Sequence, residues 1–151
     1  MHKILFSKDD QVTLVNKLEA IEAIEMQEYG KNGVPGPFPA PLSERYSRFV
    51  DVLFKEFPDL ESTLHHAATG CATEGGEILD NSKKAWAHGK PIDVLNLVEE
   101  LGDQLFYMQK IMNMLGLTIA DIQRANMHKL MQRYPSGKYS DADAQARLDK
   151  V

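Results

Sequence analysis

Two long stretches with helical periodicity, joined through Gly89-Lys90-Pro91, constrain this chain more than any other feature of its sequence. In the first stretch, residues 59–88, apolar side chains recur at alternating spacings of four and three, the pattern of a buried helical seam. The second stretch, residues 92–115, has a similar seam, and it stops at Gly116, a residue type that favours helix termination. Pro91 suits the first turn of the second helix. Because the break is short, we expect the two helices to pack antiparallel.

The apolar positions of the two seams can be read directly from the sequence. In the first helix they are Leu60, Leu64, Ala67, Cys71, Ile78 and Ala85, and in the second Val94, Val98, Leu101, Leu105, Met108, Met112 and Leu115. Further apolar residues lie beside the second seam, at Leu97, Phe106, Tyr107, Ile111 and Met114. The second helix is therefore expected to be covered on more than one side.

Shorter helices are predicted on either side of this pair. One runs from Ser7 to about Tyr29, and the segment 30–41, with four prolines and three glycines, excludes regular structure. Ser43 is expected to cap a short helix that ends near Phe57. Thr118 and Asp121 predict a capped helix over residues 119–134, and a tail follows. No segment alternates like a strand, so the predicted class is all-α, a helical bundle of about five helices.

Length and composition indicate one domain in a reducing environment. The chain has 151 residues and a mass of 17.0 kDa, which is a typical single-domain size. A formal charge of −5 argues against a nucleic-acid partner. No apolar run approaches the roughly 20 residues needed to cross a bilayer, so no membrane partner is expected. The single cysteine, Cys71, excludes an intrachain disulfide and indicates a cytoplasmic location.

Carboxylates interrupt the seams in a way that points to a cation site. Glu74 takes a seam position in the first helix, and Glu77 follows one turn later. In the second helix, Glu100 and Asp103 lie one turn apart, at distances from the break that match those of the first pair. The four side chains can therefore face one another, and an all-oxygen set favours Mg²⁺ or Mn²⁺ over zinc. Taken singly, each acidic pair is better explained by an exposed helix face or, for Glu74, by a basic partner.

The two glycines between the first pair of carboxylates need a reason, because each costs a helix about 1 kcal/mol relative to alanine. Gly75 and Gly76 lack side chains, so another group can approach the helix closely beside the site.

These motifs resemble the ExxE…ExxD signature of the MazG-like all-α nucleoside triphosphate pyrophosphohydrolases. The residues that carry the signature are Glu74-Gly75-Gly76-Glu77 and Glu99-Glu100-Leu101-Gly102-Asp103. Other segments in the style of this family are His66-Ala67-Ala68, Thr73, Lys83-Lys84, Gly89-Lys90-Pro91 and Asn126…Lys129-Leu130…Arg133-Tyr134-Pro135. The resemblance covers about residues 65–147. We accordingly divide the single domain into N-terminal helices and loop (1–57), a MazG-like core (58–135) and a tail (136–151).

The resemblance implies metal-dependent hydrolysis of a nucleoside triphosphate to the monophosphate and pyrophosphate, with Mg²⁺ as cofactor and Mn²⁺ as a substitute. Glu74, Glu77, Glu100 and Asp103 would be the metal ligands, and Glu77 is also our choice of general base. The chain has no Gly-rich phosphate loop, so side chains must meet the phosphate charge. The residues expected to do so are Lys83, Lys84, Asn126, Lys129 and Arg133. A solvated surface is the competing interpretation for each lysine.

Two other classes of protein fit the sequence less well. A carboxylate-bridged di-iron bundle wants Glu-x-x-His on two helices, and this spacing does not occur. A non-catalytic helical protein-interaction module is the alternative function, but it has no need of four acidic residues and a basic face around one helix pair. The resemblance also implies a homodimer or homotetramer, in which pairing of subunits completes a four-helix core.

Overall fold

The computed structural model describes residues 12–13, 15–20 and 41–150, and the regular structure in these ranges is entirely helical. The elements are α2 (Leu42–Leu53), α3 (Leu60–His88), α4 (Val94–Leu115), α5 (Ile119–Arg133), α6 (Asp141–Ala146) and the 3₁₀ helix η1 (Leu148–Lys150). The all-α prediction is confirmed. Residues 12–13 and 15–20 are helical, but most of the predicted first helix, and the proline-rich segment before Pro41, lie outside the described residues.

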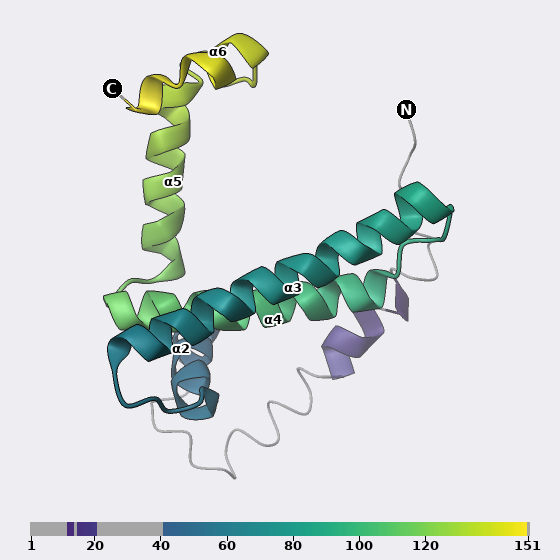
Figure 1. Cartoon of the computed structure of the whole chain (residues 1–151), viewed down its shortest axis with the longest axis vertical. Coiled ribbons are helices and arrows are strands. Elements are labelled where there is room, and N and C mark those ends of the chain that lie inside the picture. Colours follow the sequence, from purple (N-terminus) through teal and green to yellow (C-terminus); the bar gives the residue numbers. More distant parts are fainter. Residues whose placement is uncertain (1–11, 14, 21–40, 151) are drawn as a thin grey trace.

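The antiparallel pair α3 and α4 forms a long hairpin that spans the width of the molecule (Figure 1). Helix α3 begins where predicted, because the Asp59 carboxylate accepts a hydrogen bond from the backbone amide of Ser62 at 2.6 Å. It ends at Gly89, whose φ of 62° is a left-handed conformation that glycine adopts without strain. Helix α4 ends in the same way at Gly116, with a φ of 66°.

The start of α4 differs from the prediction that Pro91 lies in its first turn. The helix begins at Val94, and Asp93 is its N-cap. The Asp93 carboxylate accepts a hydrogen bond from the backbone amide of Asn96 at 3.1 Å, which satisfies an amide that would otherwise be unpaired. The cap therefore sets the helix boundary, and Pro91 lies in the connection.

Helix α2 is shorter than predicted and begins earlier. Pro41, in place of Ser43, is its N-cap, and the backbone becomes extended at Phe54, before Phe57 is reached. This turn buries the Phe54 ring, whose centroid lies 5.8 Å from the ring centroid of Phe106 and 5.4 Å from that of His66. Burial of an aromatic side chain outweighs one further helical turn at this position.

Helix α2 is fastened to α4 by polar contacts as well as by this aromatic cluster. Ser47 donates its hydroxyl to Asn113 Oδ1 at 2.8 Å, and Asn113 returns a hydrogen bond to the Ser47 carbonyl at 2.8 Å. Lys110 forms an ion pair with Asp51 at 2.8 Å. These contacts place α2 against the end of the hairpin where α4 finishes and α3 begins (Figure 1).

Helix α5 points away from the hairpin and carries α6 and η1 at its far end (Figure 1). Its start is the predicted capping box, in which Thr118 and Asp121 each bond the other's backbone amide. Helix α6, whose N-cap Ser140 accepts a hydrogen bond from the Asp143 amide, was not predicted. Arg133 fastens the tail to α5 through two hydrogen bonds, of 2.7 and 2.6 Å, to the Asp149 carboxylate.

Part of the predicted α4 seam is exposed in the described part of the chain, although Met112 of the same seam is buried. Helix α3 packs on the face of α4 that carries Gln104 and Tyr107, and the Tyr107 ring lies so close to Gly70 that a Cβ there would come within 2.4 Å of it. The neighbouring face of α4 is exposed by between 36% and 51% at four successive apolar positions. These residues, which we call the α4 stripe, are Val98, Leu101, Leu105 and Met108.

Candidate active site

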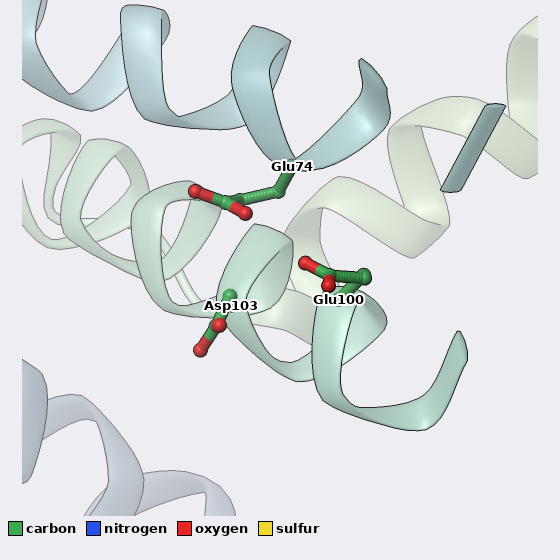
Figure 2. Close-up of side chains that lie close together, drawn as sticks. All are labelled: Glu74, Glu100 and Asp103. Atoms are coloured by element: carbon green, nitrogen blue, oxygen red, sulfur yellow. The ribbon is translucent and has the colours of Figure 1, made fainter. Parts of the chain in front are cut away.

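Three of the four predicted carboxylates meet where α3 faces α4. Glu74 comes from α3, and Glu100 and Asp103 come from successive turns of α4 (Figure 2). One carboxylate oxygen from each of the three lies within 4.8 Å of the others. Glu74 lies 15 residues before Gly89, and Glu100 and Asp103 lie 11 and 14 residues after it, so antiparallel packing brings these side chains together.

The local environment makes this cluster electrostatically costly without a cation. Glu100 is only 9% exposed. Burial raises the pKa of Glu74, the nearby charges of Asp103 and Glu100 raise it further, and the Thr73 hydroxyl opposes this from 3.2 Å. Carboxylates that are partly buried and close together repel one another unless positive charge compensates them.

The residues present fit a hard divalent cation. The clustered donors are all carboxylate oxygens, which Mg²⁺ and Mn²⁺ prefer, whereas structural zinc sites favour cysteine and histidine. The cluster uses three of the four predicted ligands.

Glu77, the fourth, lies outside the cluster. Its side chain is exposed and lines a hollow of about 500 Å³ at the turn end of the hairpin, a volume within the range of small-molecule sites. Asn81, Lys84 and Lys90 line the same hollow. Glu77 is thus one helical turn from Glu74 and beside a region that a ligand can enter.

The glycines of this segment have different neighbours. A Cβ at Gly75 would lie 3.3 Å from Gln104 Nε2, so this glycine does allow α4 to approach closely. At Gly76 no described protein atom lies within 4 Å, so packing between the helices does not account for this glycine. Gly70, one turn before Glu74, is the glycine on which the packing depends most.

The predicted phosphate-binding residues are distributed over two regions. Lys83 and Lys84 are exposed on α3, and Lys84 forms an ion pair with Asp80 at 2.6 Å. Asn126 and Lys129 are exposed on α5, whereas Arg133 is occupied by Asp149. The α5 residues therefore share a helix, but they do not join the carboxylate cluster.

Two residues near the cluster had not been predicted. Asn96 donates a hydrogen bond of 2.7 Å to Glu100 Oε1, and its position one turn before Glu100 was the available signal. The second is Tyr46 on α2, whose hydroxyl has a pKa raised by burial and by the negative charge of Asp103. No local pattern could have indicated Tyr46, because the effect of Asp103 on it depends on the packing of α2 against α4.

No helix in the described ranges is long and apolar enough to cross a membrane.

Comparison with known proteins assigns a family to the chain. No curated protein and no solved structure matched the chain significantly. The family described as the MazG nucleotide pyrophosphohydrolase domain matches residues 62–137, just over half of the 151 residues, and this segment includes the carboxylate cluster. The resemblance noted from the sequence is thereby confirmed, and the chain belongs to the MazG nucleotide pyrophosphohydrolase family.

Proposed function

We propose that this protein hydrolyses nucleoside triphosphates to the nucleoside monophosphate and pyrophosphate, with Mg²⁺ as cofactor and Mn²⁺ as a substitute. In this reaction water adds across the anhydride bond between the α- and β-phosphates, and pyrophosphate leaves. The observation that carries the proposal is the meeting of Glu74, Glu100 and Asp103 inside the segment that matches the family.

The carboxylates have two roles: they bind the cation, and one of them accepts a proton from the attacking water. Glu74, Glu100 and Asp103 would hold the ion, and Glu77 would be a fourth ligand or the general base that accepts the proton of the attacking water. A divalent ion bound there would neutralise the charge that phosphate oxygens carry in the transition state. The exposure of Glu77 supports its role, because a general base must be reachable by water.

Side chains must supply the remaining positive charge. Lys83 and Lys84 are on the same helix as Glu74 and Glu77, at the end where the hollow opens. Asn126, Lys129 and Arg133 would bind phosphate oxygens from α5 once this helix and the carboxylates face the same substrate. Arg133 would then exchange its contact with Asp149 for one with phosphate.

The proposed assembly is a homodimer or homotetramer. The α4 stripe has helical spacings of three, four and three, and it is exposed in the single chain. A second copy that covers the stripe would complete a four-helix core through an isologous, largely apolar interface. We place the protein in the cytoplasm, in keeping with its free cysteine, Cys71.

A nucleotide panel tests the activity. Canonical and modified nucleoside triphosphates are incubated with Mg²⁺, and with Mg²⁺ plus excess chelator, and the products are separated. Monophosphate and pyrophosphate in the first reaction only are expected. Diphosphate and phosphate would contradict the proposed bond cleavage. No turnover of any nucleotide would favour the non-catalytic interaction module.

Light scattering at micromolar concentration tests the assembly. A mass of two or four chains is expected, and Leu101→Lys on the α4 stripe should shift it to one chain, because a charge at an apolar interface is unfavourable. Wild-type protein that is active at a mass near 17.0 kDa would exclude the assembly and favour coverage of the stripe by the N-terminal residues.

A further inference from the structure

A buried asparagine, Asn81 on α3, is held in one orientation by the backbone of Asp93. The residue is 4% exposed. Its Nδ2 donates to the Asp93 carbonyl at 2.7 Å, and its Oδ1 accepts from the Asp93 amide at 3.2 Å. A backbone N–H can only donate and a carbonyl can only accept, so the two ends of this side-chain amide cannot be exchanged.

This fixed orientation is passed to a second asparagine. Asn81 Nδ2 also donates to Asn96 Oδ1 at 3.3 Å, which turns the Asn96 Nδ2 toward Glu100. Asn96 donates from that nitrogen to Glu100 Oε1 at 2.7 Å. A donor thus faces the Glu100 carboxylate, and the backbone of Asp93 sets the direction of every hydrogen bond in this series.

Asp93, from which this series of hydrogen bonds begins, is itself held in place. Asp93 caps α4 through its side chain, which accepts the Asn96 amide, and its backbone binds Asn81 on the facing helix. The connection between the helices is thereby tied to both of them. Glu100 lies at the end of this network, 9% exposed, with one of its oxygens engaged.

We propose that Asn81 and Asn96 are positioning residues, which we call the amide relay, and that they hold Glu100 so that its Oε2 is directed at the cation. The inference rests on the proposed function. Partners that orient a metal-binding carboxylate typically change metal affinity by about 10–100-fold when removed. Neither asparagine is required to touch the cation or the nucleotide.

The test measures Mn²⁺ binding without nucleotide, by electron paramagnetic resonance or calorimetry, and the Mg²⁺ concentration that gives half-maximal activity. In Asn96→Ala, both the Mn²⁺ dissociation constant and this Mg²⁺ concentration should rise about 10–100-fold. Asn81→Ala should weaken binding in the same direction, and the double variant should lose less than the two separate losses combined, because one residue acts through the other.

Asn113→Ala is the matched control. Asn113 is also a part-buried asparagine of α4 with side-chain hydrogen bonds, but they go to Ser47 and Gln109. It lies 17 residues from Asn96, about 25 Å along the helix. The control should lower the unfolding temperature measured in chelator while leaving the Mn²⁺ dissociation constant unchanged.

The outcomes separate this inference from the proposed function. If wild-type protein binds Mn²⁺ and cleaves nucleotide while Asn96→Ala binds Mn²⁺ equally well, the relay is overturned and the function stands. If wild-type protein binds no Mn²⁺, both are overturned. Should Asn96→Ala fail to fold, Asn96→Ser serves the same comparison, since its shorter hydroxyl cannot span the distance to Glu100.

Discussion

The α3–α4 hairpin carries the carboxylates of the site, whereas three of the predicted phosphate-binding residues lie on the α5 arm, by which we mean residues 119–150 (Figure 1). In the hairpin, two helices pack along their lengths, and contacts such as that between Gly70 and Tyr107 fix their separation. In the arm, α5 packs mainly with its own tail, and Arg133 binds Asp149.

This difference teaches which half of the site a single chain can position. Glu74, Glu100 and Asp103 are brought together by packing within the chain, so a single chain already arranges the residues of the proposed cation site. Lys129 is exposed on a helix that runs away from them. Its proposed role requires the arm to move or a second copy of the chain to supply the α5 face.

The largest expected effect tests the hairpin. Glu100→Gln keeps the shape of the side chain but removes its charge, and it should lower kcat/KM by about 10²–10³-fold. It should also abolish the rise in unfolding temperature that Mg²⁺ produces, because a ligand stabilises only the state that binds it. Glu99→Gln, an exposed neighbour on the same helix, should change neither quantity. Wild-type turnover in Glu100→Gln would remove Glu100 from the site.

The hairpin was also the more predictable region, for a physical reason. The helix ends at Gly89 and Gly116, and the register of Glu74 against Glu100, depend on residues within a few turns of each other or on their distance from one turn. Periodicity and capping chemistry are sufficient to predict such features.

The less predictable features depend on contacts that no local pattern encodes. Asp103 affects the pKa of Tyr46 only because α2 packs on α4. Arg133 meets Asp149, 16 residues away, only because the tail folds into α6 and η1. The exposure of the α4 stripe likewise follows from which face of α4 meets α3, and periodicity alone does not distinguish the faces.

A pair of glycine substitutions measures how tightly the hairpin is packed. Gly70→Ala would place a Cβ 2.4 Å from the Tyr107 ring and should lower the free energy of unfolding by about 1–3 kcal/mol. Gly76→Ala meets no described atom within 4 Å and should raise it by about 1 kcal/mol through helix propensity. Urea denaturation of both variants gives these values. Equal effects would mean that the hairpin does not depend on the close contact at Gly70.

A smaller effect is expected from the arm. Lys129→Ala should raise KM about tenfold with little change in kcat, since a charge-assisted contact with phosphate contributes to binding. Lys138→Ala, also exposed on the arm, is the control and should behave like wild type. Initial rates at limiting and saturating nucleotide provide the two constants. Unchanged kinetics in Lys129→Ala would make the α5 face a solvated surface and leave the hairpin as the whole site.

The smallest effect distinguishes the two regions by the sign of their response to acid, in protein kept free of metal. Hydrogen bonds from Arg133 lower the pKa of Asp149 to about 2, below its value of about 3.9 in an unfolded chain. The contact therefore stabilises the arm above about pH 4, and this stabilisation is lost as the pH falls toward 2. Burial and neighbouring charges raise the pKa of Glu74. Glu74 therefore contributes its full stabilisation to the hairpin below about pH 4, and this contribution is lost as the pH rises through the raised pKa.

Hydrogen-exchange protection factors measured at pH 5.5 and pH 2.5 provide the test. On going from pH 5.5 to pH 2.5, the protection of residues 141–150 should fall relative to that of α3 and α4. In Asp149→Asn the arm should already be less protected at pH 5.5 and should show little further loss in acid. An equal fall in both regions of the wild-type protein would mean that arm and hairpin unfold as one unit.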